Sequence, residues 1–251
     1  MIWWSSRPAP KRVLVYGDSL SWGWIPQATF IPAERFPPED QWPRVMAERL
    51  GEGWEVVVDA LPGRTTDTSD PLAPQIGGAG LDGLAYLPAA LGAHAPLDLV
   101  VLMLGSNDLK PQFFRSSFRI ALGVGRLIDV VQRSGNMFGT YWTNYPAPAV
   151  LVVCPPPLGR LAQAVGDLFT GWEDRAQGMQ EAYRHVAAAA GVAYFDAGTV
   201  ASCDGKDGVH LLPETQRLLG EAMAIQVRTT LESVAAGQDP APPIGTGNIA
   251  S

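Results

Sequence analysis

One serine, one histidine and two aspartates have the types and spacing that would suit nucleophilic acyl transfer. The stretch "VLVYGDSLSWGW" places Asp18 and Ser19 after an apolar run, and "DGVH" places Asp207 three residues before His210. A serine hydroxyl is a weak nucleophile until a base takes its proton. An imidazole can be that base, and a carboxylate at its far nitrogen fixes the tautomer and stabilises the imidazolium. We therefore expect Ser19 to be a nucleophile, His210 its base and Asp207 the group that orients the base, whereas Asp18 is expected to stabilise the turn.

Acyl transfer also needs hydrogen-bond donors where negative charge develops on the carbonyl oxygen. Gly63 in "LPGRTT" can bring a backbone N–H close to a ligand, and Asn107 in "GSND" carries two uncharged side-chain donors. Taken singly, Gly63 is also typical of a type II turn after Pro62, and Asn107 of an Asx turn. They become candidates together because each follows a different predicted strand.

The other titratable residues predict no second site. His94 follows an alanine-rich helical stretch and His185 lies within "EAYRHVAAAA", so both are expected to be structural or surface residues. The set Asp18, Asp108, Asp207 and His210 could be imagined as metal ligands, but the chain has no HxxxH or CxxC pattern. We expect no metal and no cofactor.

These residues need a scaffold that brings distant parts of the chain together. Apolar residues on consecutive positions are typical of strands covered on both faces, as in a parallel sheet, and segments with helical spacing separate them. This alternation predicts a doubly wound, three-layer α/β/α sandwich, in which ligands gather at the carboxyl ends of the strands. The expected strands are Arg12–Tyr16, Glu55–Asp59, Leu97–Leu104, Val150–Cys154 and Val192–Phe195, and the expected helices are Trp42–Leu50 with Asp40 as its cap, Gly80–His94, Ser116–Arg133, Trp172–Ala190 and Pro213–Leu231.

Residues 1–234 are expected to form a single domain. Two long, proline-containing loops, Ile25–Glu39 and Pro62–Gly78, follow the first two strands and are expected to help form the site. The last segment, "AAGQDPAPPIGTGNIAS", lacks periodicity, so residues 235–251 are expected to form a flexible tail.

The composition favours a soluble protein with small-molecule ligands. The chain has 251 residues, of which 47% are hydrophobic, and a formal net charge of -7, which argues against nucleic-acid binding. No apolar stretch approaches the length of a membrane span or of a signal-peptide core. Cys154 and Cys203 are expected to be free thiols in a reducing compartment. We expect a cytoplasmic protein that contacts neither membrane nor nucleic acid.

The four polar blocks resemble those of the SGNH (GDSL) hydrolase superfamily. "GDSL", the glycine of "LPGRTT", "GSND" and the "DxxH" of "DGVH" occur in the family's order over roughly residues 13–219. The stretches "YGDSLSWGW", "GRTT", "MLGSNDLK", "YPAP", "PPPL" and "FDAG" are similar to the bacterial arylesterase/acyltransferase branch. "GxSxG", the signature of the other large α/β hydrolase fold, is absent around Ser19.

The resemblance implies a flavodoxin-like sheet of five parallel strands in the order 2-1-3-4-5. It implies a triad of Ser19, Asp207 and His210. The oxyanion hole would then consist of the Ser19 amide, Gly63 and Asn107. The residues it implies in the substrate site are Trp24, Ser106 and Val209, with Trp24 matching the family's "WGW" and walling the acyl site.

We therefore expect a serine esterase or acyltransferase that acts on short-chain carboxylic esters, with aryl esters or acetylated carbohydrates as substrates and water or an alcohol as acyl acceptor. An alternative is a lysophospholipase or thioesterase with a longer acyl channel. A non-catalytic flavodoxin-like binding module is a further alternative, but "GDSLSWG" is not a Gly-rich phosphate loop. We also expect a homo-oligomer. The resemblance implies it, because the family branch tends to form symmetric oligomers, and a dense group of aromatic residues favours burial against another surface: Phe138, Tyr141, Trp142 and Tyr145.

Overall fold

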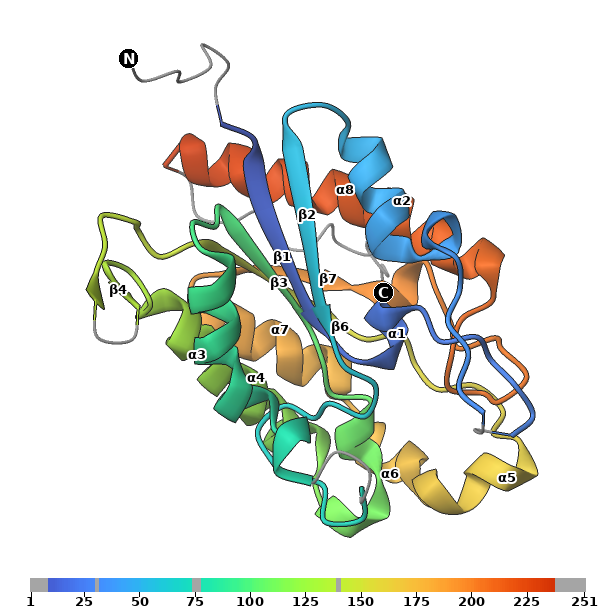
Figure 1. Cartoon of the computed structure of the whole chain (residues 1–251). Coiled ribbons are helices and arrows are strands. Elements are labelled where there is room, and N and C mark those ends of the chain that lie inside the picture. The colour runs from blue at the N-terminus through green and yellow to red at the C-terminus, as the bar shows by residue number, and fades with distance from the viewer. Residues whose placement is uncertain (1–8, 30–31, 74–77, 139–140, 238–251) are drawn as a thin grey trace, which may run out of the picture.

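The chain forms a five-stranded parallel sheet with helices on both faces (Figure 1). The structure, a computed structural model, describes residues 9–29, 32–73, 78–138 and 141–237. The strand order is β2-β1-β3-β6-β7, which confirms the predicted order 2-1-3-4-5 and the flavodoxin-like fold. The strands are β1 (Lys11–Gly17), β2 (Trp54–Ala60), β3 (Leu99–Met103), β6 (Ala149–Cys154) and β7 (Ala193–Asp196).

The helices form two outer layers. α2 and α8 pack against each other on one face of the sheet, and α4 packs against α3 and α7 on the other (Figure 1). The short helices α1, α5 and α6 belong to the loops. The helices are α1 (Ser19–Trp22), α2 (Trp42–Leu50), α3 (Gly83–His94), α4 (Ser117–Gln132), α5 (Gln163–Gly166), α6 (Trp172–Ala176), α7 (Met179–Ala189) and α8 (Pro213–Ala235).

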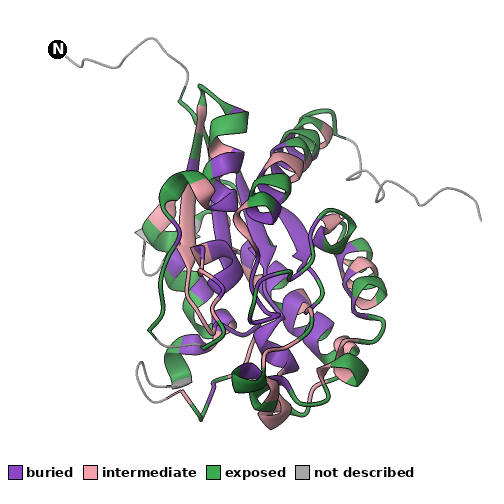
Figure 2. Cartoon of the chain, turned by 90° about the vertical axis from the view of Figure 1, so that its right-hand side faces the viewer, coloured by how far each residue is buried: buried purple, intermediate pink, exposed green. Residues whose placement is uncertain are grey.

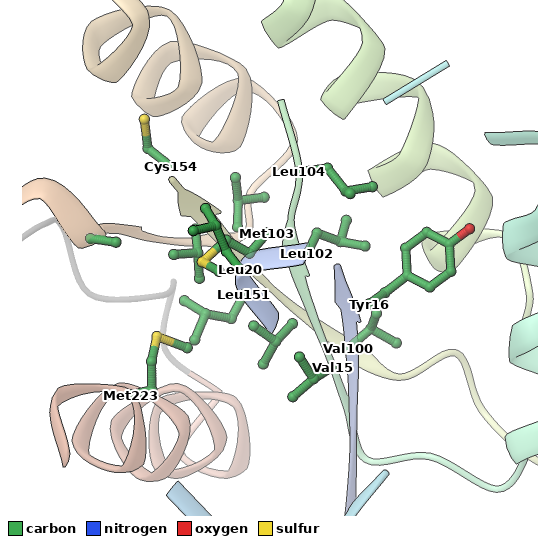
Figure 3. Packing of buried hydrophobic residues seen from close by; sticks show 14 of the residues in the cluster. Val15, Tyr16, Leu20, Val100, Leu102, Met103, Leu104, Leu151, Cys154 and Met223 are labelled. Atoms are coloured by element: carbon green, nitrogen blue, oxygen red, sulfur yellow. The ribbon is translucent and has the colours of Figure 1, made fainter. Parts of the chain in front are cut away.

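The core lies between the sheet and the inner faces of these helices. Every residue of β3 is buried, as expected for a central strand covered on both sides, and Figure 2 shows buried residues gathered on the sheet between exposed outer helix faces. Met223 of α8 points toward Leu151 of β6, whereas Tyr16 of β1 points to the opposite side of the sheet (Figure 3). The Tyr16 hydroxyl donates a hydrogen bond to the carbonyl of Gly83 in α3 at 2.7 Å.

Two of the predicted helical features were wrong. The helix predicted over Trp172–Ala190 is broken into α6 and α7, because Gly178 between them has a left-handed backbone (φ 72°). Asp40 does not cap α2, because residues 38–40 form a short 3₁₀ turn and Gln41 occupies the cap position.

The segments outside the main sheet match the sequence predictions unevenly. Two short antiparallel strands, β4 (Met137–Phe138) and β5 (Tyr141–Trp142), pair outside the main sheet, and the sequence did not predict them. α8 continues to Ala235, and most of the predicted tail, residues 238–251, lies outside the described residues. None of the helices in the described ranges combines the length and apolar character of a membrane span.

Candidate active site

Ser19 lies where β1 ends and the chain turns at once into α1. It is the first residue of that helix, and the Asp18 carboxylate caps the helix by accepting a hydrogen bond from the N–H of Leu20 at 3.0 Å. Close packing requires glycine just before this turn, because a Cβ on Gly17 would lie 2.3 Å from Oγ of Ser21. The serine is therefore held at the carboxyl edge of the sheet by a tightly packed turn.

The loop before α8 brings an imidazole and a carboxylate to this serine. Nε2 of His210 lies 2.9 Å from Oγ of Ser19, and Nδ1 of His210 lies 2.7 Å from Oδ2 of Asp207. The other carboxylate oxygen of Asp207 accepts hydrogen bonds from the N–H groups of Val209 at 2.8 Å and His210 at 2.9 Å. Asp207 is thus fixed by two backbone donors, and the imidazole is fixed between Asp207 and Ser19.

Burial and hydrogen bonding together set the protonation of the aspartates around this serine. Ser19, His210 and Asp207 expose 7%, 2% and 0% of their surface. Burial raises the pKa of Asp207, but the hydrogen bonds and charge of His210 and the two amides outweigh it, so that this pKa lies below its ordinary value. Asp18 has weaker compensation, and burial raises its pKa to about 7. Asp207 is therefore ionised at neutral pH, as a partner of an imidazolium must be.

The two predicted oxyanion donors lie in loops that are tied to the same turn. The side-chain N–H groups of Asn107 donate to Oδ2 of Asp18 at 3.3 Å and to the carbonyl of Arg64 at 3.2 Å. Gly63 occupies a turn closed by a hydrogen bond from the Arg64 N–H to the Leu61 carbonyl, and its φ of 87° is one that glycine adopts readily. The turn interpretation of Gly63 is thus correct, and it is compatible with a role for its N–H in the site.

The three predicted substrate-site residues lie in different surroundings. The Trp24 ring stacks on His210, with ring centroids 5.1 Å apart and an angle of 12° between the planes. Val209 is buried beside Asp207. Ser106 is buried and lines a cavity of about 20 Å³, a volume near that of one water molecule, whose walls include Cys154 but not Ser19, His210 or Trp24. The structure thus brings Trp24 and Val209 to the triad residues, whereas Ser106 faces a neighbouring cavity.

Arg64 was missed by sequence reasoning. Only 2% of its surface is exposed, and its guanidinium donates to the carbonyl of Gly17 at 3.1 Å and to Asp59. The stretch "GRTT" drew attention to this position, but nothing in it shows that the arginine points inward.

A second missed group surrounds the buried carboxylate of Asp108. The Asp108 carboxylate accepts hydrogen bonds from the N–H and the hydroxyl of Thr66. It also forms an ion pair with Arg115, whose Nη1 lies 2.7 Å from Oδ1 of Asp108. Burial raises its pKa to about 6, although Thr66 and Arg115 oppose this. Asp108 thus joins the loop that carries Gly63 to the loop that carries Asn107.

The other two histidines make contacts outside the triad. His94 faces Asp59 at 3.4 Å and His185 pairs with Glu181 on the surface. Cys154 and Cys203 are unpaired and buried. Within the described ranges, no three His, Cys, Asp or Glu side chains are grouped so as to hold a metal ion.

Comparisons with known proteins identify the family of this chain. The model of the GDSL-like lipase/acylhydrolase family matches residues 15–218. The inhibitor-bound aryl esterase of M. smegmatis is similar at 43% identity over 88% of this chain and 99% of that chain, with a TM-score of 0.82. Est24, a carbohydrate acetylesterase from Sinorhizobium meliloti, is similar at 42% identity over 87% of this chain and 98% of that chain, with a TM-score of 0.81. No match was found among curated protein sequences.

The family match covers most of the chain, and these solved structures are similar along nearly their whole length. The chain belongs to the GDSL-like lipase/acylhydrolase family and is a serine ester hydrolase.

Proposed function

We propose that this hydrolase cleaves short-chain carboxylic esters through an acyl-enzyme on Ser19. The observation that carries the proposal is the hydrogen-bonded series from Ser19 Oγ to His210 Nε2 at 2.9 Å and from His210 Nδ1 to Asp207 at 2.7 Å. These distances let one imidazole take the hydroxyl proton while the carboxylate stabilises the charge that it gains.

In the first half of the reaction, Oγ of Ser19 attacks the ester carbonyl and its proton passes to Nε2 of His210. The carbonyl oxygen becomes negative and accepts hydrogen bonds from the N–H groups of Ser19 and Gly63 and from the side-chain amide of Asn107. The contacts of the Asn107 amide with Asp18 and Arg64, at 3.3 and 3.2 Å, are longer than the usual 2.9–3.0 Å, so the amide can be shared with an oxyanion. The intermediate collapses when His210 returns the proton to the leaving alcohol.

In the second half, water or an alcohol attacks the acyl group on Ser19 and gives its proton to His210, which passes it to Oγ of Ser19 as the bond between the acyl group and Oγ breaks. Attack by water releases a carboxylic acid, and attack by an alcohol releases a new ester. Trp24, stacked on His210, supplies an apolar wall at this point, which limits water and favours transfer to an alcohol.

The substrate class follows from the relatives. The similar structures are described as an aryl esterase and a carbohydrate acetylesterase, so aryl acetates and acetylated sugars are the substrates we assign. Val209 adds to the proposed acyl site beside Trp24, whereas Ser106 lines the neighbouring cavity.

A chain-length series with 4-nitrophenyl esters tests the substrate class. We expect kcat/KM to be highest for acetate and butyrate and to fall for longer acyl chains. An increase beyond about eight carbons would instead indicate a long acyl channel, because each buried CH₂ contributes ~0.8 kcal/mol. Ser19→Ala, which leaves the capped turn intact, should abolish turnover in the same assay.

Acyl transfer is tested separately. With an alcohol in excess in buffered water, the ratio of new ester to free acid reports the acceptor. A measurable yield of ester is expected, and hydrolysis alone would contradict the transfer activity.

We further propose that the protein is a cytoplasmic homo-oligomer. Apolar side chains just before and within the first turns of α4 are exposed, among them Phe114 at 91% and Phe118 at 62%. Exposed apolar groups of this kind favour burial against another copy. The two buried, unpaired cysteines suit a reducing compartment. Light scattering coupled to size exclusion should give a mass that is a multiple of 26.8 kDa, and a monomer would contradict the assembly.

A further inference from the structure

We propose that Arg64 is a positioning residue that holds the oxyanion donors in place relative to Ser19. This inference rests on the proposed function and adds to it a residue that does not touch the substrate. The side chain and backbone of Arg64 together connect three of the four polar blocks of the sequence.

The guanidinium of Arg64 joins the end of β1 to the end of β2. Nη1 donates to the carbonyl of Gly17 at 3.1 Å and to the carbonyl of Asp59 at 2.7 Å, and Nη2 donates to the Asp59 carboxylate at 2.9 Å. The Gly17 carbonyl also accepts the N–H of Leu61 at 3.1 Å. Gly17 directly precedes Asp18 and Ser19, so the nucleophile turn is tied twice to the loop that carries Gly63.

The backbone of Arg64 makes the other two connections. Its N–H closes the turn around Gly63 by donating to the Leu61 carbonyl at 3.0 Å, and its carbonyl accepts a side-chain N–H of Asn107 at 3.2 Å. Any movement of Arg64 therefore moves both proposed oxyanion donors that lie outside the nucleophile turn.

Two aromatic rings fix the guanidinium in its buried position. Its central carbon lies 4.1 Å from the ring centre of Tyr16 and 5.3 Å from that of Tyr86. A planar guanidinium can stack on the rings and donate from a rigid fork, whereas a lysine ammonium can make a cation–π contact but lacks the planar group and the fork of donors. The site thus needs arginine itself at this position.

The test is a double-mutant cycle of Arg64→Gln with Asn107→Ala, read as kcat and KM on 4-nitrophenyl acetate. Arg64→Gln should lower kcat by about 10- to 100-fold, since small misplacements of catalytic donors have effects of this size, with KM changed by less than about threefold. In the Asn107→Ala background, Arg64→Gln should lower kcat by less than about a third of that factor. The loss is smaller because Arg64 acts in part through the Asn107 amide, which this background lacks. Equal losses in both backgrounds, or a rise in KM alone, would overturn the inference.

Controls separate this inference from a loss of folding and from a failure of the proposed function. Arg49→Gln removes an arginine that pairs with Glu221 on α2 and α8, away from the site, and should leave kcat unchanged. If Arg64→Gln is not recovered folded, Arg64→Lys keeps the charge and takes its place in the cycle, with the same expectation. If Ser19→Ala is as active as wild type, the proposed function fails; if it is inactive and the cycle is multiplicative, only the role of Arg64 fails.

Discussion

Replacing Asp207 by asparagine should inactivate the enzyme although the two side chains have the same shape. One carboxylate oxygen of Asp207 accepts the N–H groups of Val209 and His210, and the other faces Nδ1 of His210. In Asp207→Asn, the amide oxygen must take the place that faces the two backbone donors, so the NH₂ group faces Nδ1. The imidazole then carries its proton on Nε2 and cannot take one from Ser19.

The size of the effect follows from the contacts that a rotated amide would lose. The productive tautomer requires the NH₂ group to face both backbone N–H groups, which leaves two buried donors without partners at about 1–3 kcal/mol each. A gap of about 2–6 kcal/mol corresponds to a loss of roughly 30-fold to 2 × 10⁴-fold in kcat. Loss of the carboxylate charge beside the imidazolium places the expected value near 10⁴.

Steady-state kinetics on 4-nitrophenyl acetate measures this loss, and ¹⁵N NMR of the imidazole reports the tautomer directly. The wild-type ring should carry its neutral-state proton on Nδ1, and the variant on Nε2. Asp204→Asn is a matched control in the same loop, because Asp204 accepts hydrogen bonds from the N–H of Leu212 and the hydroxyl of Thr215; its activity should stay within about twofold of wild type. An Asp207→Asn variant that keeps more than about a tenth of the activity, or that keeps the Nδ1 tautomer, would refute this reasoning.

Three further predictions concern the oxyanion donor, the buried turn and metal dependence. Asn107→Ala should lower kcat by about 10²- to 10³-fold with little change in KM, the usual cost of losing one oxyanion donor, and an equal loss expressed in KM would contradict its role. Because burial raises the pKa of Asp18 to about 7, this carboxyl favours the fold when protonated, and that contribution is lost as the pH rises from ~4 toward 7 at about 1.4 kcal/mol per pH unit. Relative to wild type, Asp18→Asn should therefore gain up to about 3 kcal/mol in the free energy of unfolding between pH 5 and pH 7, whereas unfolding curves that keep a constant difference would disprove the effect. Treatment with EDTA should leave ester hydrolysis unchanged, and activity that is lost and then restored by a divalent metal would show that a metal takes part.

The fold and most of the site could be predicted because each depends on a local pattern. Continuous β-branched runs identify the strands, and the carboxyl ends of parallel strands meet at one edge whatever lies between them. This is why Ser19 and His210, from opposite ends of the chain, lie 2.9 Å apart in the structure.

Other features depend on contacts that no local pattern contains. A glycine within a helical stretch is only a weak signal, so the sequence does not show that Gly178 takes the left-handed backbone (φ 72°) that separates α6 from α7. The buried position of Arg64 requires the rings of Tyr16 and Tyr86 from two other elements, and "GRTT" alone is equally suited to an exposed turn.

The central claim is that Ser19 forms the covalent intermediate, and labelling with a fluorophosphonate followed by peptide mapping tests it most directly. The reagent should modify Ser19 in the wild-type protein, with loss of activity in proportion to labelling. It should leave Ser19→Ala unmodified. Stoichiometric label on any other residue, or full activity after Ser19 has been modified, would contradict the account.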